Sequence, residues 1–276
     1  MPKKRLNEKN DLLDPLFITY FTSHFMIKLK ELRAYLDRLL PGNGVMDYGP
    51  NGLQVEGKEG IAKLATAVSA SLATIEAAIQ QGVNALIVHH GMFWQRDPYI
   101  IEGTKRKKLE LLLRQGISLF AYHLPLDMHS EIGNNWKAAK DMKWFDLQPF
   151  GYVDKTPIGV KGKIHPCSRS AFKEKLESYY QHAATCAWGG PEQIQTVALV
   201  SGGAYKTISE AAAERIDAFI TGNFDEPAWH QSIEEGVNFY ALGHSATERV
   251  GPIALASKIE QDLKLPCSFI DIENPF

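Results

Sequence analysis

Short apolar runs alternate with segments of helical hydrophobic spacing along most of the chain. Apolar runs typical of buried strands occur at 64–69, 84–88, 117–122, 196–200, 218–221, 239–242 and 267–272. The spacing of apolar positions predicts helices over 27–40, 72–81, 105–114, 170–180, 207–214, 226–235 and 252–263. Alternation of strands and helices predicts an α/β fold with helices layered on largely parallel sheets.

The middle of the chain departs from this alternation. Proline and glycine punctuate 145–190, where short strands surround one predicted helix. We therefore expect a smaller inserted subdomain at 145–190, between a first α/β part at 26–144 and a second at 191–276. The first 25 residues contain a short apolar stretch that Asp14 and Pro15 interrupt. We expect residues 1–25 to be an appendage to the core fold, with Met26 as an alternative start.

Composition narrows the class of protein. The chain has 276 residues, of which 45% are hydrophobic and 22% charged, as in soluble globular proteins. A net charge of -2 provides no global basic field for nucleic acid or an anionic membrane, and no apolar run is long enough to span a bilayer. Three widely spaced cysteines without a CxxC pair predict neither a disulfide framework nor a zinc ribbon. The default location is a reducing cytoplasm.

Three of the apolar runs end in residues that bind metals. His-His follows 85–88, an aspartate comes shortly after 119–122, and a histidine and a glutamate follow 239–242. In open α/β sheets, ligands gather at the carboxyl ends of the strands. We therefore expect one metal site built from His89, His90, Asp127, His244 and Glu248.

Each of these motifs also has a purely structural interpretation. Adjacent histidines can form a hydrogen-bonded pair at a sheet edge, and an aspartate after a strand is often a turn residue or a helix cap. Ser245-x-x-Glu248 fits the capping box, in which both side chains bond to amides at a helix N-terminus. Taken together, the three strand ends favour the metal site.

The predicted ligand set indicates the chemistry. Imidazole and carboxylate without thiolate suit zinc, iron, manganese, nickel or cobalt. Five protein ligands are natural for two divalent ions, which at about 3.5–4 Å apart can share a carboxylate and activate water for hydrolysis. His123 is a candidate for proton transfer, or else a neighbour that orients the ligands. Gly202-Gly203 is a plain turn, or else a loop where phosphate can approach backbone amides.

The sequence resembles the family called GTP cyclohydrolase 1 type 2 homologues, also known as the Nif-three-like family. The resemblance covers about Met26 to Phe276. It is carried by the motifs DYGPNGLQVEG at 47–57, VHHGMFW at 88–94, YHLPLD at 122–127, IGNN at 132–135, DAFITG at 217–222 and GHSATER at 243–249.

This resemblance implies a fold of two interlinked α/β/α layered domains. It also implies that His89, His90, Asp127, His244 and Glu248 bind two divalent ions, with Glu248 as the bridge. The family resemblance further implies a toroidal homohexamer, a trimer of dimers, whose metal sites face an internal cavity. The implied activity is hydrolysis of a nucleotide or related small molecule. The alternative is a non-catalytic metal-binding toroid for metal storage or delivery, or for association with a protein partner or DNA.

Overall fold

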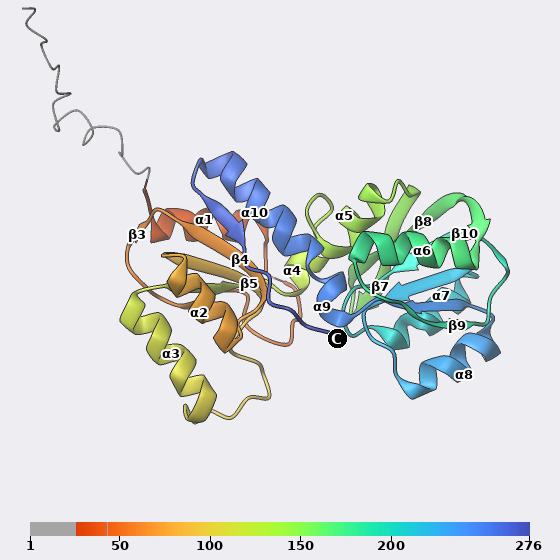
Figure 1. Cartoon of the computed structure of the whole chain (residues 1–276), viewed down its shortest axis with the longest axis horizontal. Helices are drawn as coiled ribbons and strands as arrows, with labels where there is room; N and C mark the ends of the chain where they lie inside the picture. Colours follow the sequence, from red (N-terminus) through yellow and green to blue (C-terminus); the bar gives the residue numbers. More distant parts are fainter. Residues whose placement is uncertain (1–25, 43) are drawn as a thin grey trace, which may run out of the picture.

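Two β-sheets organise the molecule, and helices cover both faces of each (Figure 1). The computed structural model describes residues 26–42 and 44–276, so the expected appendage at 1–25 lies outside the described residues. A small antiparallel pair, β1 (Ile27–Lys28) and β3 (Gly60–Ile61), accompanies the two main sheets.

The first lobe is built on a five-stranded sheet in the order β13-β4-β5-β6-β2, with β2 antiparallel to its neighbour and the other pairs parallel. Its strands are β2 (Gly52–Val55), β4 (Leu64–Ser69), β5 (Ala85–His90), β6 (Ser118–Ala121) and β13 (Cys267–Phe269). Its helices are α1 (Leu29–Leu39), α2 (Leu72–Gln80), α3 (Gly103–Gln115) and α10 (Val250–Leu263).

Alternating residues of β5 pack into two separate cores of this lobe. Ile87 packs in the core with Leu36 of α1 and Ile259 of α10, whereas Val88 packs in the core with Ile75 of α2. Successive strand residues point to opposite faces of a sheet, so an uninterrupted apolar strand requires helices on both sides. This arrangement is an α/β/α sandwich.

The second lobe is built on a six-stranded sheet in the order β7-β8-β10-β11-β12-β9, with three parallel strands at its centre. Its strands are β7 (Phe145–Val153), β8 (Thr156–Ser168), β9 (Thr185–Trp188), β10 (Gln193–Leu199), β11 (Ala218–Thr221) and β12 (Asn238–Ala241). One face packs on α5 (Asn134–Asp141) and α6 (Arg169–Tyr180), and the other on α7 (Ile208–Ala213) and α8 (Glu226–Glu235). The second lobe is therefore also an α/β/α sandwich.

The chain links the two lobes by crossing between them twice. It enters the second lobe after the short helix α4 (Leu124–Asp127) and leaves it after α9 (His244–Thr247). The final segment then returns to the first lobe, where α10 packs on the sheet and β13 pairs with β4. Figure 1 shows α10 beside α1 and β4, which lie far away in sequence. The predicted class, two interlinked α/β/α layers, is confirmed.

The lobe boundaries differ from the expected domain boundaries. The segment 145–190 supplies β7, β8 and β9 to the same sheet as β10 instead of forming a separate layer. The glycines and prolines of this segment lie in and between antiparallel strands whose pairing contains register shifts. This irregular sequence pattern was interpreted as a separate subdomain. The end of the expected second part, from 250 onward, belongs to the first lobe.

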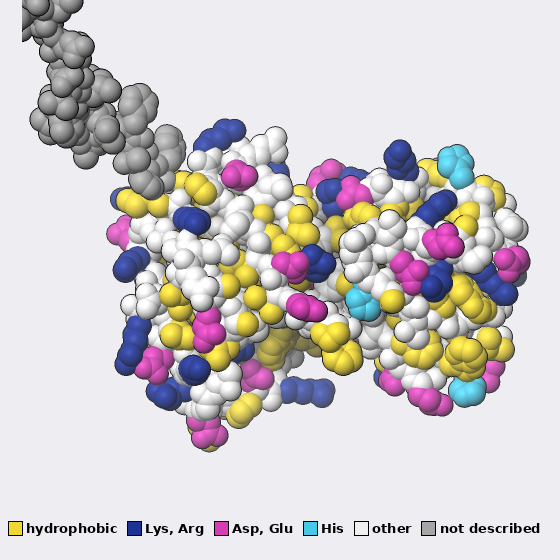
Figure 2. All heavy atoms as spheres, viewed as in Figure 1, with side chains coloured by type: hydrophobic (Ala, Val, Ile, Leu, Met, Phe, Trp, Pro, Cys, Tyr) yellow, Lys and Arg dark blue, Asp and Glu magenta, His cyan; other side chains and the backbone are white. Residues whose placement is uncertain are grey.

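Charges of both signs are mixed on the visible face of the molecule. On the face seen in Figure 2, lysine and arginine side chains are interspersed with aspartate and glutamate. Within 26–42 and 44–276, every helix is too short or too polar to cross a membrane.

Candidate metal centre

The predicted site residues meet where the two lobes join. His89 and His90 end β5, Asp127 is the last residue of α4, and His244 and Glu248 begin and follow α9. The first three residues come from the first lobe and the last two from the second. All lie at or just beyond the carboxyl ends of parallel strands, as expected for a ligand site in an α/β fold.

The carboxylate of Glu248 lies at the centre of the cluster. Its Oε1 is 3.4 Å from His89 Nε2, and its Oε2 is 3.1 Å from His90 Nε2 and 3.2 Å from His244 Nε2. Asp127 Oδ2 lies 3.6 Å from His89 Nε2. Two sets of three residues share Glu248, and within each set the potential ligand atoms lie within 4.8 Å of one another: His89 with Asp127, and His90 with His244.

The two contacts of His89 Nε2, at 3.4 and 3.6 Å, are longer than ordinary hydrogen bonds. His89 Nε2 and Glu248 Oε2 are both buried and make no hydrogen bond within the described residues. Metal–ligand bonds of about 2.0–2.1 Å place neighbouring ligand atoms roughly 2.8–3.0 Å apart at octahedral angles and about 3.3–3.4 Å apart at tetrahedral angles. The observed separations of 3.1–3.6 Å are close to that spacing. The donor set therefore fits a metal ion.

Neighbouring groups orient the ligands. His89 Nδ1 donates to the carbonyl oxygen of Tyr122 over 3.2 Å, and His90 Nδ1 is hydrogen-bonded to Ser69 Oγ over 3.0 Å. Each Nε2 is thereby left to face the cluster, the arrangement usual for metal-binding histidines. Sequence reasoning missed both partners, because a serine and a backbone carbonyl carry no sequence signal for this role.

Asp127 is oriented by residues from two directions. Its Oδ1 accepts hydrogen bonds from Asn134 Nδ2 over 2.8 Å and from Ser201 Oγ over 3.1 Å. Asn134 belongs to the IGNN motif, and Ser201 follows β10 in the second lobe. Asn135 of the same motif accepts from the backbone N–H of Ser201 over 2.7 Å. These contacts leave Oδ2 of Asp127 on the side of the cluster.

Burial makes the electrostatics of the cluster strong. Burial raises the pKa of Glu248, but His89 and His90 overcome this effect and hold that pKa well below its usual range. For His89, burial lowers the pKa, yet the Asp127 and Glu248 carboxylates raise it to about 9. Both carboxylates are at most 4% exposed. The site thus concentrates negative charge in a buried place that favours a cation.

Gly202 is required by the position of Glu248. Its φ is +68°, and a Cβ added there would lie 2.0 Å from Glu248 Oε1. Gly203 needs no such space, since a Cβ would lie 3.4 Å from His244 Cε1. The Gly-Gly pair is therefore more than a plain turn, because its first member brings the backbone against the buried carboxylate.

The capping-box alternative for Ser245 and Glu248 is not realised. Helix α9 has Gly243 at its N-cap, and Glu248 stands at its C-terminal end, where its carboxylate faces the histidines. Helix α9 is one turn long. Because Glu248 follows His244 by four residues, both side chains lie on the same side of this turn.

His123 lies beside the cluster and is fixed by an aspartate. Its Nδ1 lies 2.6 Å from Asp47 Oδ1, and its ring centroid is 4.9 Å from that of His89. Asp47 also accepts from the backbone N–H groups of Tyr48 and Leu124 and from Asn51 Nδ2. Burial raises the pKa of Asp47, but the hydrogen bond from His123 and its other donors lower it overall.

An ionised Asp47 only accepts hydrogen bonds, so the proton of neutral His123 lies on Nδ1 and Nε2 keeps its lone pair. Asp47 was visible only as part of a family motif, because its partner is 76 residues away.

A cavity of about 780 Å³ opens onto the cluster between the two lobes. Its volume is in the range of sites for small molecules and cofactors. The first lobe contributes Tyr48, His90, Trp94, His123, Leu124 and Asp127, and the second Gly151, Tyr152, Val153, Ile158, Ser201, Gly203, Ala204, Tyr205, Lys206, Thr207, His244 and Glu248.

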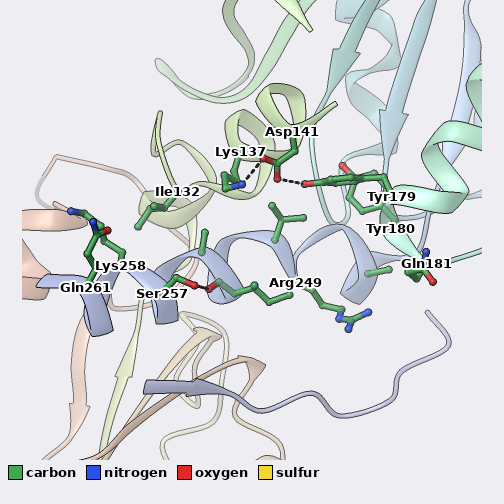
Figure 3. A pocket seen from close by; sticks show the side chains of 14 residues that line it. Ile132, Lys137, Asp141, Tyr179, Tyr180, Gln181, Arg249, Ser257, Lys258 and Gln261 are labelled. Carbon is green, nitrogen blue, oxygen red and sulfur yellow. Dashed lines mark hydrogen bonds and ion pairs between the residues drawn. The ribbon is translucent and has the colours of Figure 1, made fainter. Parts of the chain in front are cut away.

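A second cavity, of about 530 Å³, lies between α5, α10 and the end of α6 (Figure 3). Its three cations, Lys137, Lys258 and Arg249, each form an ion pair with an aspartate. Because these charges are already paired, the cavity beside the cluster is the better candidate for chemistry.

Fold and site together define a two-lobed α/β protein whose buried imidazole and carboxylate groups can hold a metal ion. The chain belongs to the DUF34/NIF3 family, described as Duf34/NIF3 (NGG1p interacting factor 3), whose model matches residues 27–275. This match confirms the family indicated by the sequence motifs.

Relatives and solved structures agree with this assignment. The chain is 46% identical over 253 residues to the GTP cyclohydrolase 1 type 2 homolog of Chlamydia pneumoniae, covering 91% of this chain and 100% of the relative. It is 39% identical over 251 residues to the protein of that name from Escherichia coli K12, covering 90% and 100%.

Among solved structures, protein ybgI, of unknown function, aligns with a TM-score of 0.85 at 38% identity, over 91% of this chain and 100% of that one. Protein TTHA1606 from Thermus thermophilus aligns with a TM-score of 0.84 at 34% identity, again over 91% and 100%.

Proposed function

We propose that the protein is a metal-dependent hydrolase acting on a nucleotide or a related small molecule. The observation that carries this proposal is the position of Glu248, whose two carboxylate oxygens each contact a different set of histidines. His89 and Asp127 with Oε1 would hold one divalent ion, and His90 and His244 with Oε2 would hold a second. When bound, such a pair polarises a substrate oxygen and lowers the pKa of a bound water.

A pair of ions would leave positive charge at the site. Two divalent ions would bring four positive charges, and Asp127 and Glu248 supply two negative charges. The excess would favour an anionic nucleophile such as hydroxide. His244 is 42% exposed at its side chain, and His90 and His123 both line the cavity. The site is thus open on one side, as a reactive centre requires.

His123 is the residue that we assign to proton transfer. Asp47 holds its Nδ1, so the Nε2 lone pair can accept a proton during attack and return it to a leaving group. Asp47 acts through His123 and is a positioning residue. Trp94 packs edge-on against the His123 ring, with centroids 5.4 Å apart, and restricts its rotation.

The test is hydrolysis of a panel of nucleotides and phosphoesters by zinc- or manganese-loaded protein. We expect turnover that requires the metal and is lost in Glu248→Gln. His123→Asn should keep the bound metal but lose most turnover, because amide nitrogen is not a base. Metal-loaded protein that turns over nothing across the panel would overturn the hydrolase proposal. It would leave the non-catalytic metal-binding scaffold as the function.

The toroidal homohexamer belongs to this proposal as well. Six chains of 30.8 kDa would give a particle of about 185 kDa, which light scattering coupled to size exclusion measures directly. A monomer or a dimer at micromolar concentration would contradict it.

A further inference from the structure

The cavity beside the metal centre contains one lysine, and its position indicates how a substrate is held. Lys206 is the only lysine or arginine among the described residues that line this cavity. It is exposed, and its Nζ lies 5.8 Å from the centroid of the Tyr205 ring, while it forms no ion pair with a carboxylate of residues 26–42 and 44–276. A cation that is unpaired within a concave site is available to an anionic ligand.

Lys206 comes shortly after the loop that contacts the metal ligands. Gly202 and Gly203 lie against Glu248 and His244, and Lys206 stands in the 3-10 turn η2 (Tyr205–Thr207) three residues later. Three residues span at most about 11 Å. The Cα of Lys206 therefore lies within about 11 Å of that of Gly203, and Lys206 lines the same cavity as the ligands His244 and Glu248.

Aromatic side chains form the cavity walls between these two ends. Trp94 and Tyr48 come from the first lobe and lie around His123, with ring centroids 5.4 Å and 5.9 Å away. Tyr152 and Tyr205 come from the second lobe, and Tyr48 and Tyr152 are 56% and 51% exposed. Exposed aromatic faces of this kind stack on planar rings.

We infer that Lys206 is a specificity-determining residue that binds the anionic group of a planar aromatic substrate, while Trp94 packs against its ring. This inference rests on the proposed function and names the substrate class of the same site: a phosphorylated heteroaromatic compound such as a nucleoside monophosphate. The ring then lies between the lobes near the metals, and the phosphate lies at the Lys206 end. Gly203, which is exposed and lines the same cavity, precedes Lys206 on this loop.

The test is calorimetric binding of adenosine 5′-monophosphate, adenosine and inorganic phosphate to zinc-loaded protein. Lys206→Met should weaken the monophosphate about tenfold or more and leave adenosine unchanged, because only the charge-assisted bond to phosphate is lost. Trp94→Leu should weaken the binding of adenosine and of its monophosphate to a similar degree. The matched control is Lys155→Met, which removes an exposed lysine from the turn after Val153 that does not line the cavity.

Two results would overturn the inference. One is equal monophosphate binding by Lys206→Met and wild type at equal metal content. The other is absence of monophosphate binding to wild type at millimolar concentration. Hydrolysis is followed in the same samples, so the two proposals can fail separately. If the monophosphate binds in a way that depends on Lys206 but is not hydrolysed, only the hydrolase proposal fails. If uncharged substrates are hydrolysed with metal and Lys206→Met has no effect, only this inference fails.

Discussion

At the scale of single residues, Glu248 decides between a structural and a chemical interpretation of the same motif. The sequence Ser245-x-x-Glu248 fits a helix cap as well as a ligand, and no pattern within the motif separates them. The structure separates them because Glu248 is 3% exposed and surrounded by three imidazoles instead of helix amides. Burying a carboxylate in this way is costly unless a cation compensates it.

Glu248→Gln should therefore abolish tight metal binding while Ser245→Ala should not. Mutation of a residue that hydrogen-bonds to a metal ligand typically lowers metal affinity 10–100-fold. Loss of a ligand shared by two ions should therefore lower metal affinity at least about 100-fold. Dialysed protein would be measured by competition with a chromogenic chelator. Equal metal affinity in Glu248→Gln and wild type would remove Glu248 from the site.

Gly202 offers a second prediction at this scale, with a closely matched control. Gly202→Ala and Gly82→Ala both place a side chain at a positive φ, +68° and +66°, which costs each variant roughly 1–2 kcal/mol. Only at Gly202 would the new Cβ meet a carboxylate oxygen, whereas nothing lies within 4 Å at Gly82.

We expect similar backbone strain in the two variants, with metal loss only in Gly202→Ala. Urea unfolding and metal content measure the two effects separately. Full metal content in Gly202→Ala would show that the loop does not have to approach Glu248 closely.

At the scale of elements, most helices and strands could be predicted because their apolar spacing is regular. The strands at Leu64–Ser69 and Ala218–Thr221 and the helix at Glu226–Glu235 have the predicted bounds. Strand β5 extends two residues beyond the apolar run, since His89 and His90 continue its hydrogen bonding. His89, His90 and Asp127 meet because the parallel strands β5 and β6 bring their carboxyl ends to one edge of the first sheet, and the packing of the two lobes brings His244 and Glu248 from the end of β12 to them.

Long-range pairing could not be predicted in the same way. The return of α10 and β13 to the first lobe depends on which sheet edge is free, and local spacing does not encode this. The partners of the ligands were missed for a similar reason. Ser69, Asn134 and Ser201 are common polar residues, and only the fold brings them to His90 and Asp127.

The contact between the loop before β2 and the start of α4 yields a prediction for Asp47→Asn. Loss of the carboxylate leaves the donors of His123, Tyr48 and Leu124 without a full set of acceptors, so stability should fall by about 1–3 kcal/mol. The downfield Nδ1 proton of His123 should also disappear from the NMR spectrum. The control is Asp37→Asn, which makes the same loss of charge at a carboxylate that accepts from Tyr122 Oη and pairs with Arg33.

The pH dependence of this variant follows from the lowered pKa of Asp47. A carboxyl whose pKa is lower in the folded state stabilises the fold above its unfolded pKa and loses that contribution as pH falls through the folded pKa. The stability difference between wild type and Asp47→Asn should therefore shrink once pH falls below the ordinary aspartate value of 3.8. A difference that grows toward acid would contradict the pairing with His123.

At the scale of the whole molecule, the ligand cluster joins two lobes that each have their own core. His89, His90 and Asp127 belong to the first lobe, and His244 and Glu248 to the second. A bound ion would therefore link the lobes directly, in addition to the two chain crossings. The second crossing carries Glu248 two residues before the start of α10, so metal binding would be coupled to lobe packing.

Metal removal should consequently lower thermal stability. Metal at 100 times its Kd contributes about 2.7 kcal/mol, and each kcal/mol shifts the Tm of a protein of this size by roughly 2–4 °C. We expect chelation to lower the Tm by at least about 5 °C in wild type and to leave Glu248→Gln unchanged. An equal Tm with and without chelator would mean that no ion stabilises the folded state.

Whether Glu248 bridges two divalent ions can be measured by elemental analysis of the purified protein, combined with an anomalous difference map from its crystals. We expect two metal ions per chain and two anomalous peaks about 3.5–4 Å apart, one on each side of the Glu248 carboxylate. A single peak away from Glu248, or metal-free protein that cannot be loaded with any divalent ion, would contradict this expectation.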